Sequence, residues 1–296
     1  MPTLDRITIY PVKSLDGVDV AECGVLACGA LENDRRWRLV DLDGRVVNAK
    51  RTPRFHLIRA EYDLAERLIT LSFWTDGSTD SAQTFPLAPG PEGPCEWLSE
   101  ALGLRVLLEE RCDGGFPDDR EAPGPTLVAT ASLEEVARWF GLDLAEARRR
   151  FRVNLEIGGC EAFWEDTLAS PARVGVPSLA DLPADLAIDP YADLPPLEPR
   201  EFAIGDVRFR ATGVCKRCPV PGRESRTGAL KELFREAFEA RRGRGLRADV
   251  DAGRWGDFYR LGVNTWATPE DGEPRLIREG TAITLFGPES RNCRHG

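Results

Sequence analysis

The chain has 296 residues, of which 42% are hydrophobic and 30% are charged, and its formal net charge at pH 7 is -10. This length and composition suit a globular protein with one large hydrophobic core or two smaller ones. The acidic balance argues against partners such as nucleic acid or an anionic membrane surface, because both repel negative charge. The apolar runs are too short to span a bilayer and the first ten residues do not resemble a signal peptide, so we expect a cytoplasmic protein.

The first seventy-five residues predict a series of short strands. Apolar and polar residues alternate in several runs, with Gly- and Asp-containing turns between them. The predicted strands cover residues 4–10, 18–28, 36–41, 55–62 and 68–74. Many short strands of this kind are typical of a β-barrel or a β-sandwich.

The remainder of the chain mixes helices and strands. Helical spacing predicts helices over residues 95–102, 132–140, 143–150 and 229–241, and strands are predicted over residues 105–109, 126–130, 153–157, 206–211, 259–266 and 281–286. The helix that starts near Ser132 has a capping-box pattern, with Ser132 as the expected N-cap. A Gly-, Pro- and Asp-rich stretch before residue 125 suggests a division into domains 1–120 and 121–290. Residues 169–199 are rich in Pro, Asp and Leu, which is typical of an inserted loop or a lid.

Basic residues crowd the first fifth of the chain. They include Lys13, Arg35, Arg36, Lys50, Arg51 and Arg54. Lys13 and Ser14 fall in a turn after a predicted strand, where ammonium, hydroxyl and backbone amides can all donate to an anion. Arg35 can grip an anion through two nitrogens. We therefore predict a local basic pocket, although a solvated turn and an Asp–Arg pair would give the same pattern.

Cys215-Lys216-Arg217-Cys218 is the sharpest chemical motif in the sequence. Two cysteines at this spacing can bind a metal, form a redox pair or supply one reactive thiolate, and the basic neighbours favour a thiolate. A zinc site would need a second such pair, which the chain lacks. Pro219 and Pro221 oppose the helix that a thioredoxin-like pair requires. A single thiolate in a loop after a strand fits best, with two merely buried cysteines as the alternative.

The other polar motifs lie in the second half of the chain. Arg152 and Asn154 alternate in a predicted strand and would then face the same side. Ser132 lies at a predicted helix N-terminus, whose amides suit an anion. The run Phe163-Trp164-Glu165-Asp166 places two acids among aromatic residues. A structural hydrogen-bonding network would explain these groups equally well.

Taken in order, these motifs resemble the MOSC family, which is named for the C-terminal domain of molybdenum cofactor sulfurase. The matching segments are Ile9-Tyr10-Pro11-Val12-Lys13-Ser14-Leu15, Asp34-Arg35-Arg36-Trp37, Phe151-Arg152-Val153-Asn154, Phe163-Trp164-Glu165-Asp166 and Cys215-Lys216-Arg217-Cys218. The resemblance is greatest to the branch of the mitochondrial amidoxime-reducing component and its bacterial relatives. It implies a β-dominated α+β fold, with an N-terminal MOSC-type β-barrel followed by a MOSC β-barrel with a few helices.

The resemblance also implies a cofactor, molybdenum held by molybdopterin, and a reaction. Cys218 would be the catalytic metal ligand, and a soft thiolate suits molybdenum held by sulfur. Cofactor-binding residues would be Lys13, Ser14, Arg35, Ser132, Arg152, Asn154 and Arg217. The expected activity is two-electron reduction of an N-hydroxylated or N-oxygenated small molecule by oxygen-atom removal. A separate electron donor of the ferredoxin or flavoprotein type would be the partner, because no cysteine-rich ferredoxin domain follows in this sequence.

Two segments depart from the family pattern. Val153 replaces the usual Pro, and Pro219-Val220-Pro221-Gly222-Arg223 replaces a run of Thr and Asp residues after Cys218. The second departure adjoins the expected metal ligand, which leaves open whether the substrate is that of the relatives. Two further functions stay open for the same residues: sulfur transfer through a persulfide on Cys218, and delivery of the molybdenum cofactor to other enzymes.

Overall fold

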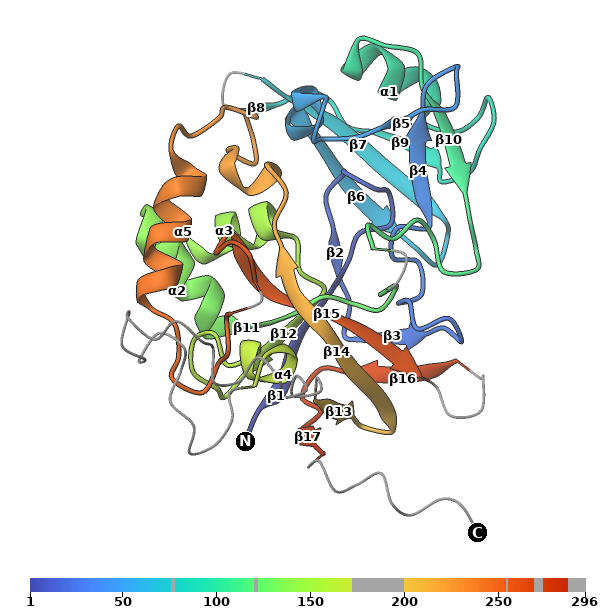
Figure 1. Ribbon diagram of the computed structural model, residues 1–296. Coiled ribbons are helices and arrows are strands. Elements are labelled where there is room, and N and C mark those ends of the chain that lie inside the picture. Colours follow the sequence, from blue (N-terminus) through green and yellow to red (C-terminus); the bar gives the residue numbers. More distant parts are fainter. Residues whose placement is uncertain (76–77, 120–121, 172–199, 254, 269–273, 287–296) are drawn as a thin grey trace.

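The structure is a computed structural model that describes residues 1–75, 78–119, 122–171, 200–253, 255–268 and 274–286. Strands outnumber helices in these residues, and the predicted β-dominated α+β class is confirmed. Most of the predicted insertion at 169–199 lies outside the described residues. Figure 1 shows two β-rich regions, one built around a large curled sheet and one from smaller sheets at its upper right.

The large sheet joins the first strands of the chain to strands from its second half. Its order is β17-β13-β14-β15-β11-β12-β1-β2. The strands are β1 (Thr3–Ile9), β2 (Val18–Asp19), β11 (Leu127–Ala129), β12 (Leu155–Gly158), β13 (Glu201–Ile204), β14 (Val207–Lys216), β15 (Arg260–Thr268) and β17 (Ile283–Leu285). β1 pairs antiparallel with β12, and β11 pairs parallel with β12. The N-terminal strand is therefore part of the second region, and the division near residue 120 stays a prediction.

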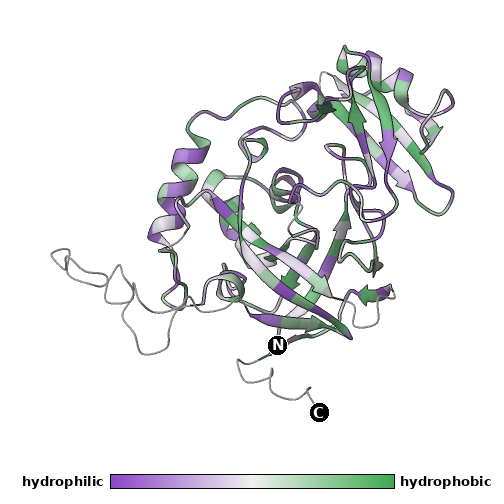
Figure 2. Cartoon of the chain, turned by 45° about the vertical axis from the view of Figure 1, so that its right-hand side comes forward, coloured by the Kyte–Doolittle hydropathy of each residue, from purple (hydrophilic) through white to green (hydrophobic). Residues whose placement is uncertain are grey.

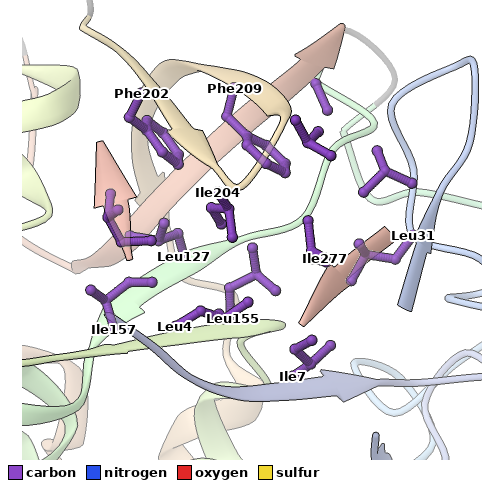
Figure 3. Close-up of a cluster of buried hydrophobic side chains, with 14 of the residues drawn as sticks. Leu4, Ile7, Leu31, Leu127, Leu155, Ile157, Phe202, Ile204, Phe209 and Ile277 are labelled. Carbon is purple, nitrogen blue, oxygen red and sulfur yellow. The ribbon is translucent and has the colours of Figure 1, made fainter. Parts of the chain in front are cut away.

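The inner face of this sheet builds the first hydrophobic core. Alternate residues of each strand point to the same face, so each strand contributes a short row of apolar side chains. Figure 3 shows Leu4 and Ile7 of β1 close to Leu155 and Ile157 of β12, with Phe202, Ile204 and Phe209 facing them. Figure 2 shows the hydropathy of each residue: hydrophobic residues make up much of the strands, whereas hydrophilic residues predominate on the helices beside them.

The other β-rich region, called the N-terminal region below, consists mainly of elements between residues 37 and 110, and Val12 and Leu15 also pack into its core. It contains β4 (Trp37–Val40), β5 (Val46–Val47), β6 (Ile58–Asp63), β7 (Leu68–Thr75), β8 (Ser78–Thr79), β9 (Gln83–Pro86), β10 (Leu107–Glu110), the 3-10 helix η1 (Pro53–Leu57) and α1 (Cys95–Leu102). Its core includes Trp37, Phe55, Ile69 and Leu98. The prediction of a helix over residues 95–102 is confirmed. A further pair, β3 (Glu22–Val25) with β16 (Arg275–Arg278), again joins the two ends of the chain.

Three longer helices lie side by side next to the large sheet (Figure 1). They are α2 (Thr130–Phe140), α3 (Leu144–Phe151) and α5 (Phe234–Arg244), with the short α4 (Asp166–Ala169) and the 3-10 helix η3 (Val220–Gly222) as further elements. Aromatic side chains join them, since the rings of Trp139 and Phe151 both pack on Phe238. Over the described residues, no helix is long and apolar enough to cross a membrane.

Two predictions about helix ends are wrong. The N-cap of α2 is Ala129, so Ser132 lies inside the helix, where its side chain bonds to neighbouring segments instead of capping. The helix predicted from residue 229 begins at Phe234, because the backbone before it is engaged elsewhere: Lys231 N donates to Gly222 O over 2.8 Å. Leu230 and Leu233 are consequently exposed rather than part of the buried helix face.

The prediction that Arg152 and Asn154 lie on one strand is also wrong. Arg152 is the C-cap of α3, with φ of 51°, and its amide donates to Arg148 O over 2.9 Å. Asn154 precedes β12, and its amide donates to Thr126 O over 3.2 Å. Helix α3 therefore continues to Phe151, and β12 begins only at Leu155. Arg152 and Asn154 lie in the connection between them, and their side chains have different surroundings.

Candidate functional site

A cavity of about 630 Å³ lies where the two regions meet. Its size is within the range of about 300–1,000 Å³ that is common for small-molecule and cofactor sites. The loop after β1, the end of α3 and the end of β14 all contribute to its walls. Six of the predicted site residues line it, namely Lys13, Ser14, Arg35, Arg152, Arg217 and Cys218.

The cavity wall has a strong excess of positive charge. Among the described residues, nine lysine or arginine residues line it: Lys13, Arg35, Lys50, Arg59, Arg149, Arg150, Arg152, Lys216 and Arg217. The acidic residues of the wall in the same part of the chain are four: Asp16, Asp34, Asp118 and Asp119. A concave surface lined by one sign of charge concentrates ligands of the opposite sign. The cavity wall of this acidic protein is therefore locally basic, as the sequence predicted.

One group of cations is organised around Asp118. Its carboxylate lies 2.9 Å from Lys13 Nζ and 3.6 Å from Lys50 Nζ. Burial alone would raise the pKa of Asp118, but the charges of Arg35 and Lys13 hold it well below its usual range. Burial lowers the pKa of Lys13, whose ammonium also donates to Phe116 O over 3.2 Å. An incoming anion can replace Asp118 as the partner of these cations.

The backbone is strained at three cavity residues. Ser14, Arg35 and Arg152 have φ values of 78°, 50° and 51°, in the left-handed region that non-glycine residues seldom adopt. Such strain persists only where surrounding contacts enforce it, and it concentrates at functional sites. At Ser14, the hydroxyl accepts a hydrogen bond of 3.1 Å from Ala49 N, which ties this turn to residues 48–50 of the wall.

Tyr10 connects two of these cations, and the sequence motif did not reveal this role. The guanidinium of Arg152 lies over the Tyr10 ring at 4.1 Å from its centroid, and that of Arg35 at 5.8 Å. The phenol donates to Val153 O over 3.4 Å. Burial raises the pKa of Tyr10 to about 12, so the ring stays neutral and attracts both cations through its face.

Cys218 follows β14 and precedes η3, in a loop after a strand as the sequence predicted. The side chain is half-buried, lines the cavity and packs on the core of the N-terminal region. Beside it, Arg217 donates to Phe151 O and to Cys215 Sγ, the latter over 3.3 Å. Arg217 Nε is buried without a partner among the described residues.

Asn154 and Ser132 do not line the cavity. The Asn154 amide bonds to Thr8 O, Asp34 Oδ1 and both donors of Thr126, each over 3.1 Å. It therefore joins the loop after β1 to β11 and β12 and supports the wall from behind.

Ser132 belongs to a separate buried network. Its hydroxyl donates to Glu165 Oε2 over 2.8 Å and accepts from Phe163 N over 2.6 Å. The following residue, Asp166, forms a fully buried ion pair with Arg242. The acids of the Phe163-Trp164-Glu165-Asp166 motif thus hold α2, α4 and α5 together.

Several cavity residues lie outside the set that the sequence predicted. His56, Arg59, Arg149 and Arg150 all line the wall. Lys50, one of the basic residues of the first fifth of the chain, also lines the cavity. Arg36, another of them, instead pairs with Glu110. Three consecutive arginines at the end of a helix, residues 148–150, were the available signal, but positive charge there usually only complements the helix dipole.

Comparison with known proteins identifies the class of the N-terminal region. Residues 1–86 match the family described as the MOSC N-terminal beta barrel domain. The chain contains this domain, and the resemblance to MOSC proteins seen in the sequence motifs is confirmed.

The chain is also a distant homologue of the molybdenum cofactor sulfurases. It is 25% identical to the protein of that name from Danio rerio over 268 residues, which is 82% of this chain and 31% of the relative. The Homo sapiens protein is 23% identical over 264 residues, 80% of this chain and 28% of the relative. The Drosophila melanogaster protein is 26% identical over 253 residues, 77% and 28% respectively. The chain thus spans about three tenths of the length of these relatives.

Proposed function

We propose that this protein is a molybdenum-cofactor-dependent oxidoreductase that reduces N-hydroxylated or N-oxygenated small molecules. The observation that supports this most directly is the convergence of cations from both regions and of the thiols of Cys215 and Cys218 on a single cavity. Lys13 and Arg35 come from the N-terminal region, and Arg152, Arg217 and Cys218 come from the other region. A phosphorylated metal cofactor needs this combination of an anion site and a soft ligand.

The residues present fit the cofactor. In this proposal Lys13, Ser14 and Arg35 hold its phosphate, because all three line the cavity and the charges of Lys13 and Arg35 already act on the carboxylate of Asp118. Arg152 and Arg217 contact the pterin, and the unpartnered Nε of Arg217 supplies a donor for it. Cys218 is the protein ligand of the metal. Asn154 and Ser132 support these residues from outside the cavity.

When bound, the molybdenum centre supplies two-electron oxygen-atom transfer. Removal of a hydroxyl oxygen from nitrogen consumes two electrons and two protons and releases water. The chain itself orients the cofactor through its cations and presents Cys218 at the cavity wall. The electrons come from a separate donor protein of the ferredoxin or flavoprotein type.

The test is metal and pterin analysis of protein made in a host that synthesises the cofactor. Wild-type protein should contain about one molybdenum per chain, and Cys218→Ser should lose the metal because a serine oxygen is a poor substitute for a soft ligand. Cys215→Ser is the matched control, since Cys215 is a half-buried neighbour in the same segment. Metal-free wild-type protein, or full metal content in Cys218→Ser, would contradict the proposal.

Sulfur transfer is the second candidate, favoured by the name of the relatives, molybdenum cofactor sulfurase. In that function the Cys218 thiolate takes the outer sulfur of a donor protein's persulfide, the donor leaves as a thiol, and Cys218 holds the sulfur as a persulfide. Mass spectrometry of the native protein separates the two functions, because a labile extra sulfur on Cys218 without bound pterin supports transfer. Bound cofactor without turnover of any N-hydroxylated compound would instead indicate a cofactor carrier.

A further inference from the structure

A second group of cations lines the cavity and has no part in the proposed cofactor site. Arg149 and Arg150 come from the end of α3, and Arg59 comes from β6. Ser225, just after η3, joins them: Arg149 Nε donates to Ser225 Oγ over 3.0 Å and Arg59 Nη2 donates to Ser225 O over 3.1 Å. Two segments distant in the sequence thus bring three guanidinium groups to one wall, and Ser225 of a third segment joins them.

Several polar atoms of this group are buried without a partner among the described residues. They are Arg150 Nη1, Arg59 Nε and His56 Nε2. Arg150 is 4% exposed and His56 is 9% exposed, and both line the cavity. A buried donor without a partner costs about 1–3 kcal/mol, and more when it is charged, so a protein seldom retains several in one place. Because Arg59, Arg150 and His56 line the cavity, a small rearrangement of their side chains would let a bound ligand satisfy these atoms.

The carboxylates in this group do not cancel its charge. Glu146 accepts from Arg150 Nε over 2.6 Å and from Arg149 Nη2 over 3.1 Å, and Asp16 lies 3.4 Å from Arg59. Two carboxylates thus face three guanidinium groups. Burial lowers the pKa of His56 to about 4, and the charges of the nearby Arg223 and Arg152 contribute to this shift. The group keeps a net positive charge at neutral pH.

The position of the group relative to Cys218 suggests what it binds. Arg217 contacts Phe151 at the end of α3, immediately after Arg149 and Arg150. In the other direction, the chain from Cys218 passes through η3 to Ser225. The thiol is therefore connected by short segments to this group, whereas the cations around Asp118 belong to a separate network.

We propose that Arg59, Arg149 and Arg150 form a second oxyanion subsite, the Arg149 subsite, which binds a carboxylate or phosphate group of the substrate. The existence of the subsite follows from the geometry alone, and its assignment to the substrate rests on the proposed function. The same chemistry could come from a second phosphate on a dinucleotide form of the cofactor. In either case planar guanidinium groups provide paired donors for the oxygens.

Titration with inorganic phosphate at low ionic strength tests the subsite without any turnover. The background is Lys13→Gln, which weakens the site around Asp118, and isothermal titration calorimetry gives the dissociation constant. Phosphate should still bind to this variant, and added Arg149→Gln should weaken binding about tenfold or more, since a charged hydrogen bond is worth about 1.5–3 kcal/mol. Unchanged phosphate affinity after Arg149→Gln would overturn the subsite, whether or not the protein contains molybdenum.

A second variant separates an effect on phosphate binding from a loss of folding. Arg150→Lys keeps a charge for Glu146 but removes the unpartnered Nη1, so the fold should be retained while phosphate affinity falls. Urea unfolding of each variant confirms that the native state is intact. Wild-type phosphate affinity in folded Arg150→Lys counts against the subsite.

Two further measurements identify the source of the anion. Arg149→Gln should keep wild-type molybdenum and pterin contents, and it should raise KM for an amidoxime that bears a carboxylate about tenfold or more while leaving a neutral amidoxime unaffected. Loss of pterin from Arg149→Gln would assign the subsite to the cofactor and overturn the assignment to the substrate. An equal change in KM for both amidoximes would also overturn the assignment to the substrate.

Discussion

The guanidinium of Arg152 lies over the ring of Tyr10, 4.1 Å from its centroid. Tyr10 follows the first strand of the large sheet, and Arg152 closes α3 half the chain later. The same ring also faces the Arg35 guanidinium, at 5.8 Å. One neutral aromatic side chain therefore positions two cations of the cavity that belong to different regions.

Replacement of Tyr10 should weaken anion binding through these two cations. Tyr10→Leu removes a cation–π attraction of about 0.5–2 kcal/mol, so phosphate affinity should fall about twofold to thirtyfold. Tyr10→Phe keeps the ring and loses only the hydrogen bond to Val153 O, and it should keep near-wild-type affinity. Calorimetric titration with phosphate measures both. Equal losses in the two variants would show that the ring does not position the cations.

The buried ion pair between Arg242 and Asp166 should be important for stability. Both side chains are fully buried. Arg242→Met leaves the Asp166 carboxylate buried without its cation, which costs about 3–5 kcal/mol in comparable cases. The control is Arg45→Met, which removes an exposed pair with Asp43 and should cost under about 1 kcal/mol. Urea midpoints at pH 7 compare the two, and similar midpoints would contradict the expectation.

Glu165 should make the protein less stable as the pH rises. Burial and the neighbouring Asp166 raise the pKa of Glu165 to about 8, against the opposing effects of Ser132 and Arg242. A raised folded-state pKa contributes stability that is complete below the unfolded value and is lost as pH increases through about 8. Glu165→Gln removes this titration and can still accept from Ser132. The variant should therefore gain stability relative to wild type between about pH 5 and about pH 8.

Parallel urea titrations of wild type and Glu165→Gln at several pH values measure this difference. Taking the difference between the two proteins cancels the contributions of titrating groups that do not interact with Glu165, such as Glu146 and Asp118, and leaves those of Glu165 and the neighbouring Asp166. A difference that stays constant over this pH range would show that Glu165 is ionised throughout.

Glu146 should compete with anions for the Arg149 subsite. Hydrogen bonds from Ser225, together with that from Arg150, lower the pKa of Glu146 to about 2 in spite of its burial, so it is ionised at neutral pH. Glu146→Gln removes this negative charge from Arg149 and Arg150. Phosphate affinity should rise about threefold or more, while stability falls because the charged hydrogen bonds are lost. A decrease in phosphate affinity in folded Glu146→Gln would contradict the proposed competition.

Much of the local structure could be predicted from residue patterns. The helix over residues 95–102 has apolar positions at helical spacing and a glycine after its end, and it forms with these bounds. The Asp143 N-cap accepts from Glu146 N over 2.6 Å, as expected of an acid before a helix. The predictions failed where tertiary contacts replaced a local rule. Ser132 resembled an N-cap, yet its hydroxyl is engaged by Glu165 and Phe163, so the helix begins before it.

The candidate site divides in the same way. The residues that motifs predicted and that the cavity brings together each lie in or beside a short, recognisable segment: Lys13, Ser14, Arg35, Arg152, Arg217 and Cys218. Asn154 belongs to such a motif as well, but its side chain bonds to Thr8 O, Asp34 and Thr126 and does not line the cavity. Sequence periodicity cannot tell which of these side chains line the cavity. The prediction assumed side chains that alternate along a strand, and the left-handed backbone at Arg152 breaks this alternation.

Residue types and their order along the chain were enough to predict the fold class and the family of the N-terminal region, whereas the choice of Cys218 within its Cys-x-x-Cys segment stays a prediction. The meeting of Arg59 with Arg149 and Arg150 beside the cavity is visible only in the folded chain. β6 and the end of α3 are brought together there by the backbone and hydroxyl of Ser225. Local patterns report hydrophobic faces and turns, whereas the convergence of distant charges depends on how the two cores pack against each other.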